Sequence, residues 1–216
     1  MRGLMLVLAR LILGRDLRVT GLEHIPRQGP ALVVGNHVGT VDPVLLGVSI
    51  QRLDVYYMAK SELFRNPLLG WLFRRCHTFP VIRDSPDRGA LRRALTVLGG
   101  GHVLLLYPEG TRSEGGEAGR PHAGAGFIAR HARVPIIPVG SWGSQRVLPR
   151  GGRLPRRAPV RLTVGEPFTL PAAGPSGRPL SNQEAADLMM SRVMPLVARS
   201  QGAEPRIPLG RRTPAA

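Results

Sequence analysis

The sequence has one cysteine, one lysine and few aromatic residues, and each shortage excludes a class of structure or partner. Cys76 is the sole cysteine among 216 residues, so no disulfide can form within the chain and a reducing compartment is favoured. No cysteine and histidine residues stand at zinc-ligand spacing, so no structural metal is expected. Aromatic residues make up only 5% of the chain and are not interleaved with arginines, which argues against a stacking surface for single-stranded nucleic acid.

A hydrophobic run long enough to cross a bilayer is also missing at the N-terminus. A spanning helix needs about 20 apolar residues, whereas the run at 4–13 is shorter and contains Arg10. No small-residue cleavage site of a signal peptide follows it. Two interpretations stay open: an interfacial helix with its arginines toward lipid headgroups, or a first helix packed on the domain. The first interpretation defines residues 1–20 as an amphipathic membrane-associating helix.

Positive charge is in large excess. The chain has 30 lysine and arginine residues against 14 acidic ones, a formal net charge of +16, and Lys60 is its only lysine. Arginine binds pairs of phosphate oxygens, so the composition favours nucleic acid, anionic lipid or a phosphate-bearing small molecule as partner. Coding bias would explain arginine in place of lysine, but it would not explain the net charge. The arginine-rich segment 150–161 is either a solvated loop or a membrane-facing patch.

Apolar strand-like runs alternate with segments of helical pattern. This alternation predicts an α/β fold, a single layered domain with a mostly parallel mixed sheet flanked by helices. Strands are expected at 31–35, 55–59, 78–82, 102–107, 135–139 and, as an edge strand, 160–165. Helices are expected at 43–52, 61–73, 85–99, 124–133 and 181–200. The folded domain is expected to span 21–200, and the segment 201–216 has little to bury and is expected to be a flexible basic tail.

A histidine and an aspartate, His37 and Asp42, stand five positions apart directly after the expected strand 31–35. On a helix that spacing places the side chains roughly 140° apart, and on a strand it sends them to opposite faces. They can meet only if the backbone turns, which Gly39 facilitates. A carboxylate that holds an imidazole in one tautomer is the arrangement of acyl-transfer sites. The alternative is a solvated histidine, with Asp42 capping a helix that has Pro43 at its first position.

Two further polar segments follow expected strands. Residues 79–83 end in Arg83, and the segment Tyr107-Pro108-Glu109-Gly110-Thr111-Arg112-Ser113 enters a tight turn. Because sites in open α/β sheets lie outside the carboxyl ends of the strands, these segments and the His37 turn are expected to converge. Taken singly, Arg83 could be a solvated charge and Glu109 could pair with a neighbouring arginine.

Four motifs occur in a fixed order along the chain. They are Asn36-His37-x4-Asp42, Phe-Pro-Val-x-Arg ending at Arg83, Pro-Glu-Gly-Thr-Arg-Ser at 108–113, and Val-Pro-Ile-Ile-Pro-Val at 134–139. With this order and spacing, the chain resembles the 1-acylglycerol-3-phosphate acyltransferases, also called lysophosphatidate acyltransferases, of the glycerolipid acyltransferase superfamily. The resemblance covers about residues 20–170, and the segment from Ala59 to Pro67 is similar to the family's linker between the first two motifs.

The resemblance implies a role for each motif. His37 would be the general base that takes the proton of an acceptor hydroxyl, and Asp42 would orient it. Arg83 would contact the acceptor phosphate, and Pro138 would be tied to acyl-donor binding or to the shape of the site. The residues assigned to substrate binding are Lys60, Arg83, Glu109, Gly110, Thr111, Arg112 and Pro138.

The resemblance also implies the reaction and its setting. The hydroxyl would attack the thioester of acyl-CoA or acyl-carrier protein directly, so no cofactor, metal or acyl-enzyme is expected. The acceptor would be a lysophospholipid, foremost 1-acylglycerol-3-phosphate, which gives phosphatidic acid. The expected partners are this donor, this acceptor and an anionic membrane surface, with no nucleic acid. The enzyme would work at the cytoplasmic face of the cell membrane as a peripheral or monotopic protein.

Two departures from the family pattern leave the acceptor open. His77 stands near a place where the family usually has glycine, and Arg120 and His122 stand where a lysine is frequent. Another lysophospholipid or a glycolipid alcohol is therefore the alternative acceptor.

Other classes have weaker sequence support. The segment Gly140-Ser141-Trp142-Gly143 is one residue short of the nucleophile elbow of serine hydrolases. The Gly-Lys-Ser/Thr signature of phosphate-binding NTPases is missing. A basic, non-catalytic protein that binds nucleic acid or membranes rests on the charge alone.

Overall fold

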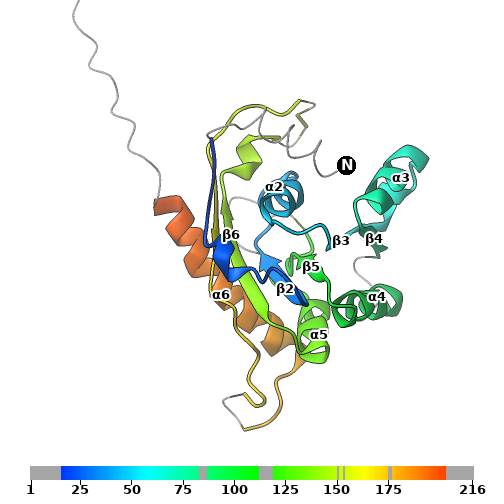
Figure 1. Cartoon of the computed structure of the whole chain (residues 1–216), viewed down its shortest axis with the longest axis vertical. Coiled ribbons are helices and arrows are strands. Elements are labelled where there is room, and N and C mark those ends of the chain that lie inside the picture. Colours follow the sequence, from blue (N-terminus) through cyan, green and yellow to red (C-terminus); the bar gives the residue numbers. More distant parts are fainter. Residues whose placement is uncertain are drawn as a thin grey trace, which may run out of the picture.

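A computed structural model describes residues 16–82, 87–111, 119–149, 151–152, 154–174 and 177–202 of the chain. These residues form a seven-stranded sheet in the order β1-β7-β6-β2-β5-β3-β4 (Figure 1). Only β6 and β7 pair in the antiparallel sense. The strands are β1 Leu17–Thr20, β2 Ala31–Gly35, β3 Val55–Lys60, β4 Thr78–Val81, β5 Val103–Leu106, β6 Ile136–Trp142 and β7 Val160–Val164. The helices are α2 Asp42–Ser49, α3 Pro67–Arg75, α4 Arg88–Gly99, α5 Ala123–Ala132 and α6 Asn182–Gly202. The predicted α/β fold with a mostly parallel mixed sheet is confirmed.

Helices cover both faces of the central strands. α4, α5 and α6 lie on one face, where Leu32 and Val34 of β2 join their core, and α2 lies on the other face with Ala31 and Val33 (Figure 1). Because both faces are covered, every residue of β2 is buried, which explains why this strand is a continuous apolar run instead of an alternating one.

The N-terminal boundary differs from the expectation. Residues 17–20, expected as the end of a membrane-associating helix, form β1, which pairs with β7 in parallel. β7 is therefore an inner strand and not the expected edge strand. β1 has alternating burial and includes the β-branched Val19 and Thr20, a composition that suits a half-exposed edge strand. The remainder of the expected helix, residues 1–15, lies outside the described residues.

The helix expected over 61–73 is two elements. Ser61–Phe64 forms a short 3-10 turn, and α3 begins only at Pro67. The side chain of Asn66, not Ser61, caps this helix by accepting a hydrogen bond from the backbone N–H of Leu69 at 3.1 Å. Pro67 favours this start because proline fits the first helical position. At the other end of the chain, α6 continues to Gly202, inside the expected tail, and 203–216 lie outside the described residues.

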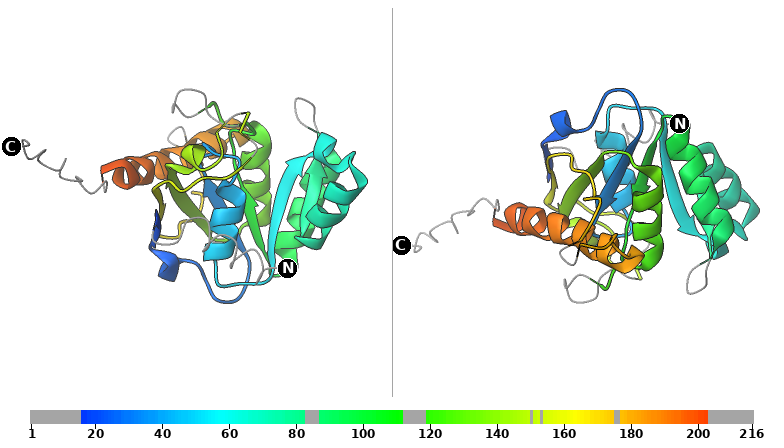
Figure 2. Two further views of the ribbon diagram at one scale, coloured as in Figure 1. Left: turned by 90° about the horizontal axis from the view of Figure 1, so that it is seen from above. Right: turned by 90° about the horizontal axis from the view of Figure 1, so that it is seen from below.

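Two glycines let α6 lie close to α5 and to the sheet. A Cβ on Gly126 of α5 would lie 1.8 Å from the Asn182 carbonyl oxygen, and a Cβ on Gly140 of β6 would lie 2.3 Å from the Leu196 carbonyl carbon. These positions need glycine for space. The result is a compact part formed by α5, α6 and β6, while β3, β4 and α3 lie at the opposite end of the sheet (Figure 2).

The sheet forks at the carboxyl end of β3. This strand pairs with β5 only as far as Tyr57 opposite Leu105, and from Tyr57 to Lys60 it pairs with β4 instead. β3 and β5 therefore part at the edge of the sheet where the predicted site residues lie.

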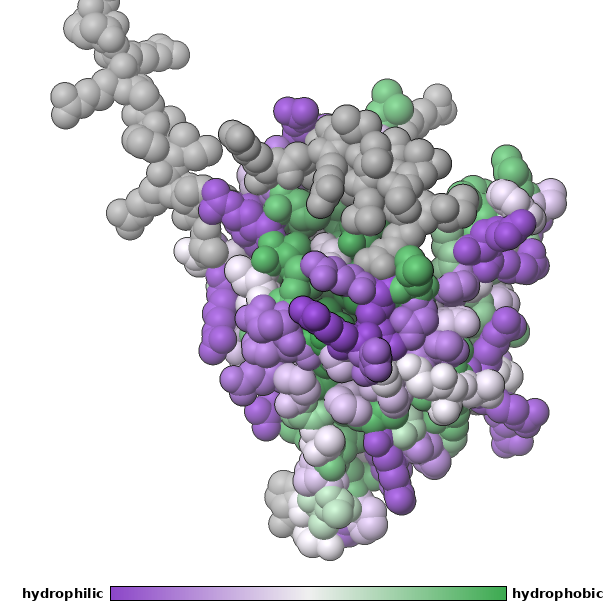
Figure 3. All heavy atoms as spheres, viewed as in Figure 1, coloured by the Kyte–Doolittle hydropathy of each residue, from purple (hydrophilic) through white to green (hydrophobic). Residues whose placement is uncertain are grey.

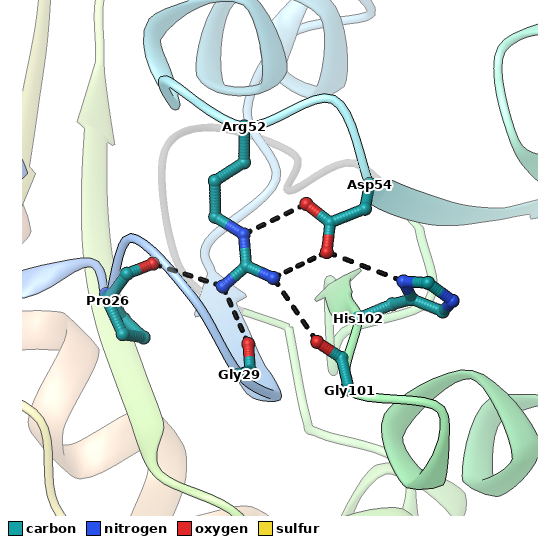
Figure 4. A network of polar contacts seen from close by, with 6 residues as sticks. All are labelled: Pro26, Gly29, Arg52, Asp54, Gly101 and His102. Atoms are coloured by element: carbon teal, nitrogen blue, oxygen red, sulfur yellow. Dashed lines mark hydrogen bonds and ion pairs between the residues drawn. The ribbon is translucent and has the colours of Figure 1, made fainter.

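The opposite edge of the sheet is held by Arg52 (Figure 4). The residue is 8% exposed. Its guanidinium binds both carboxylate oxygens of Asp54 and donates to the carbonyls of Pro26, Gly29 and Gly101 at 3.0, 2.6 and 3.2 Å. These groups precede β3, β2 and β5, so one side chain joins the starts of the three strands.

Candidate active site

His37 and Asp42 meet in a turn between β2 and α2. The Nδ1 atom of His37 lies 3.0 Å from Oδ2 of Asp42, and the backbone N–H groups of Val38 and Gly39 donate to the same oxygen at 2.8 and 2.7 Å. Asp42, the first residue of α2, is completely buried. The predicted turn is confirmed, although Gly39 is needed for space: a Cβ there would lie 2.6 Å from the backbone of Ser144.

This geometry fixes the protonation pattern of the imidazole. With Asp42 accepting at Nδ1, the neutral ring carries its proton on Nδ1 and its basic lone pair on Nε2. The ring is 14% exposed and lines a cavity, so the histidine can take a proton from a group bound there. The buried carboxylate can stabilise the imidazolium that results.

Tyr107 supports the imidazole from its face. The two rings stack with centroids 4.5 Å apart and 25° between their planes. The Tyr107 hydroxyl is buried and has no hydrogen-bond partner among the described residues. Burial raises the pKa of the phenol well above its usual range, and the charge of Asp42 and the neighbouring Tyr57 add to the shift. Tyr107 therefore stays neutral and acts as an aromatic support.

Glu109 joins the third motif to the first. Its Oε1 accepts a hydrogen bond from the backbone N–H of His37 at 3.2 Å, and Oε2 accepts one from Gly119 at 2.8 Å. The residue is 2% exposed. The carboxylate thus binds the backbone of two loops, which positions His37, and it does not line the cavity.

Asn36 holds the end of β2 against β6. Its side chain donates to the carbonyl of Ser141 at 3.0 Å and accepts from the N–H of the same residue at 2.7 Å. Sequence reasoning assigned no role to Asn36 or to Tyr107. The sequence did contain one indication of the role of Asn36, because the apolar run of a buried strand ends at this amide, directly before His37.

The cavity beside His37 has a volume of about 1390 Å³. It passes through the fork in the sheet, between Met58 and Ala59 of β3 and Leu105 and Leu106 of β5. Helices on both faces of the sheet form its walls. Residues of α2 and α3 line it on one side, and residues of α4 and α5 line it on the other. Most of the lining side chains are apolar, so the cavity suits a long apolar ligand whose reacting end lies at the imidazole.

Only some of the predicted substrate-binding residues reach this cavity. Lys60 and Gly110 line it, and the Lys60 amine also pairs with Glu62 at 3.0 Å. Gly110 has φ +64°, and a Cβ there would lie 2.8 Å from the ring of His122, another lining residue.

The remaining predicted residues lie elsewhere. Thr111 is exposed and its N–H donates within the turn, to the carbonyl of Glu109 at 2.7 Å. Pro138 is buried in β6 opposite Val34 and does not line the cavity. Arg83 and Arg112 lie outside the described residues.

His77 has the backbone conformation of a glycine. Its φ is +55°, in the left-handed region, and its ring stacks on Tyr56 with centroids 4.8 Å apart. The residue lines the cavity between α3 and β4. The turn between α3 and β4 therefore has the left-handed conformation that glycine adopts readily. The histidine at this position adds a stacking contact with Tyr56.

A buried carboxylate that orients a histidine at the carboxyl edge of an α/β sheet, beside a long apolar cavity, is an arrangement suited to group-transfer enzymes that act on apolar substrates. The acyltransferase family model matches residues 16–142, more than half of the chain. The chain belongs to this acyltransferase family.

The chain is similar in sequence to several lipid acyltransferases. A 1-acyl-sn-glycerol-3-phosphate acyltransferase of Bacillus subtilis (strain 168) is 31% identical over 152 residues, which are 70% of this chain and 73% of that protein. A lyso-ornithine lipid O-acyltransferase of Pseudomonas aeruginosa is 34% identical over 125 residues, 57% of this chain and 46% of that protein. The chain spans about half the length of other curated relatives that it matches.

A solved structure has the same fold. The 1-acyl-sn-glycerophosphate acyltransferase PlsC from Thermotoga maritima superimposes with a TM-score of 0.74 at 26% sequence identity, covering 95% of this chain and 83% of that one. Among the described residues, none of the helices combines the length and the apolar character that crossing a membrane requires.

Proposed function

We propose that this acyltransferase moves a fatty acyl group from acyl-CoA or acyl-carrier protein to the hydroxyl of a lysophospholipid. The foremost acceptor is 1-acylglycerol-3-phosphate, and the product is then phosphatidic acid. The observation that carries this proposal is the imidazole of His37, fixed by Asp42 and facing the apolar cavity.

The proposed reaction needs one base and no covalent enzyme intermediate. Nε2 of His37 takes the proton of the acceptor hydroxyl while its oxygen attacks the thioester carbonyl carbon. The tetrahedral intermediate then collapses, the C–S bond breaks, and the imidazolium returns its proton to the leaving thiolate. Asp42 stabilises the imidazolium between these steps. A thioester is already activated, so this base and the binding of both substrates supply the main parts of the catalysis.

The size of the cavity supports a lipid substrate. Pockets for small ligands span about 300–1000 Å³, and this one is larger, at about 1390 Å³. It extends from His37 through the fork between β3 and β5, so an acyl chain can lie among apolar walls while the reacting carbonyl stays at the imidazole.

The proposed identity of the acceptor headgroup rests on the charge of the chain and on the names of its relatives. The excess of arginine favours a phosphate, and Arg83 and Arg112 are proposed to bind the acceptor with Lys60 at the cavity. A second candidate is another lysolipid alcohol, because one relative is named for a lyso-ornithine lipid. Lipid substrates and the net charge of +16 further support work at an anionic membrane. The proposed setting is the cytoplasmic face of that membrane, with a peripheral or monotopic protein. The aromatic content of 5% argues against a single-stranded nucleic-acid partner.

The test combines a variant with a substrate panel. Wild-type protein and His37→Ala are incubated with acyl-CoA or acyl-carrier protein and a panel of lysolipids that includes 1-acylglycerol-3-phosphate and lyso-ornithine lipid, and the products are weighed by mass spectrometry. His37→Ala should lose on the order of 10²–10⁴ in rate and keep its folded circular-dichroism spectrum.

The matched control is His131→Ala, at an exposed histidine of α5, which should keep its activity. Full activity of His37→Ala would refute the mechanism. A product from lyso-ornithine lipid alone would select the second acceptor.

A further inference from the structure

α3 presents an apolar ridge to solvent. Leu68, Leu69 and Trp71 are 72%, 43% and 53% exposed, and we call these three side chains, together with Arg65, Arg74 and Arg75, the α3 ridge. In the space-filling view, apolar and strongly hydrophilic side chains lie next to each other over this helix (Figure 3). Exposed clusters of large apolar side chains mark contact surfaces in proteins that are otherwise soluble.

The helix is attached to the body through Gly70 and Phe73. Gly70 is its only buried residue, and Phe73 packs against Phe64 with ring centroids 5.5 Å apart. Leu72 and Phe73 line the catalytic cavity. Leu72 lies one turn from Leu68 on the same flank of α3, and Arg75 of the ridge also lines the cavity, so the exposed ridge borders the cavity wall.

The charges of the ridge are all positive. The guanidinium of Arg75 lies 5.6 Å from the centre of the Trp71 ring, and that of Arg74 lies 5.7 Å from the centre of the Phe64 ring. None of the three arginines has an acidic partner among the described residues. Cations beside an aromatic and leucine-rich surface match the headgroup region of an anionic leaflet, where tryptophan and arginine are the typical anchors.

We propose that the α3 ridge inserts into the boundary between headgroups and acyl chains of an anionic lipid leaflet. Leucine side chains enter the apolar layer, Trp71 lies at headgroup depth, and the arginines bind lipid phosphates. A lipid surface fits better than a protein partner because three arginines flank the exposed apolar side chains, and the ridge lies on a short helix at one end of the molecule (Figure 2).

The consequence, which rests on the proposed function, is lateral access of the acceptor. The leaflet would contact the exposed side chains of α3, and Leu72, Phe73 and Arg75 of the same helix line the cavity beside them. A lysolipid could then pass from the leaflet past this helix to His37, and the product could return without crossing water.

Binding is tested on the full-length protein with vesicles of phosphatidylcholine, with and without phosphatidylglycerol. Trp71 and Trp142 are the only tryptophans, so a Trp142→Phe background makes Trp71 the sole reporter. Its emission should shift to the blue with the anionic vesicles, and brominated lipids should quench it. An unshifted spectrum on vesicles that bind the protein would overturn the proposal.

Two variants and a control locate the surface. Leu68→Ser/Trp71→Ser should weaken cosedimentation with anionic vesicles by about tenfold or more, and Arg65→Gln/Arg74→Gln should weaken it only where phosphatidylglycerol is present. The control is Leu154→Ser, at a leucine of the arginine-rich segment that is 81% exposed, and it should bind as wild type. Wild-type binding by Leu68→Ser/Trp71→Ser would overturn the proposal. It would also be overturned if sedimentation showed a dimeric wild type that this variant converts to a monomer with vesicle binding unaltered, because the ridge would then contact a second copy of the chain.

An activity measurement separates this proposal from the proposed function. Neither Leu68 nor Trp71 lines the cavity. Leu68→Ser/Trp71→Ser should therefore keep its rate on a short-chain acceptor dissolved in water and lose rate on the same headgroup embedded in vesicles. Equal losses on both acceptors would overturn the α3 proposal. Inactivity of the wild type on every lysolipid would overturn the proposed function, while the vesicle-binding result would still decide the role of α3.

Discussion

Tyr107 and Asp42 hold the imidazole of His37 from two directions. The carboxylate binds its Nδ1 atom and fixes the rotation of the ring, whereas the stacked phenol limits tilting of the ring plane. The buried hydroxyl of Tyr107 has no partner among the described residues, so it contributes a desolvation cost without an evident hydrogen bond. The useful part of this residue is its ring.

The prediction separates the ring from the hydroxyl. Tyr107→Phe should keep the rate within about twofold of wild type and raise the free energy of unfolding by roughly 1 kcal/mol, because an unpaired buried hydroxyl is removed. Tyr107→Leu removes the stack and should lower kcat by about tenfold or more, because small displacements of a base are costly. Steady-state kinetics and urea denaturation measure both effects. A large loss of kcat in Tyr107→Phe would instead assign a chemical role to the hydroxyl.

The pair of His37 and Asp42 was open to prediction at this scale, but their supports were not. A motif names side chains, whereas the supports depend on which backbone lies within reach once the sheet is folded. Asn36 binds Ser141 and Glu109 binds the N–H of His37 across 105 and 72 positions of sequence. Local pattern carries no information on contacts of that range.

At the scale of elements, the turn between α3 and β4 sets the position of a cavity wall. His77 stands in this turn with φ +55°, directly before β4, and its ring stacks on Tyr56 of β3. Left-handed backbone is accessible to asparagine and histidine but strongly disfavoured for β-branched residues. The conformation of this single residue therefore helps to decide how α3 returns to the sheet.

A matched pair of substitutions tests the strain at His77. His77→Asn and His77→Val both lose the stack on Tyr56, but only valine is strained by the positive φ. The valine variant should be less stable than the asparagine variant by about 1–2 kcal/mol in chemical denaturation. The same pair at His131, inside α5, should differ little because asparagine and valine have similar helix propensities. Equal stabilities at His77 would contradict the strained turn.

Elements with strong periodicity were predictable, and those that depend on a distant partner were not. The buried strand 31–35 has the predicted bounds, because an apolar run covered on both faces has one stable state. β1 was missed because it is four residues long and half-exposed, and its pairing partner β7 begins 140 residues later. The fork of β3 was also missed, since pairing with two neighbours leaves no local signature in the sequence.

At the scale of the whole molecule, the two ends of the central strands differ: the amino ends are tied together, and β3 and β5 part at their carboxyl ends. Arg52 joins the starts of β2, β3 and β5 at the amino edge (Figure 4). At the carboxyl edge β3 leaves β5, and the cavity passes between them. The Arg52 cluster therefore ties together the starts of the strands whose carboxyl ends part at the fork.

This cluster predicts a pH dependence of stability. The Arg52 guanidinium lowers the pKa of Asp54 from 3.8 to about 2 through its hydrogen bonds, and the attraction of its charge adds to the shift. The unfolded chain therefore binds more protons than the folded one as the pH falls below about 5, and the stabilisation that Asp54 gives above its unfolded pKa is lost as the pH falls toward 2. A third of the Asp54 side chain is exposed, so solvent screening reduces the contribution to about 1 kcal/mol.

Asp54→Asn should lower the free energy of unfolding at neutral pH by at least this amount, because Arg52 stays buried without its charged partner. Between pH 5 and pH 2 its stability should fall less steeply than that of the wild type. Urea denaturation at a series of pH values measures both. Glu166→Gln, which removes an exposed carboxylate after β7, controls for the loss of one surface charge. If Asp54→Asn and wild type lost stability in parallel over that range, the tie between the amino ends of the strands would not depend on the Asp54 carboxylate, and the backbone carbonyls around Arg52 would have to hold the three strands.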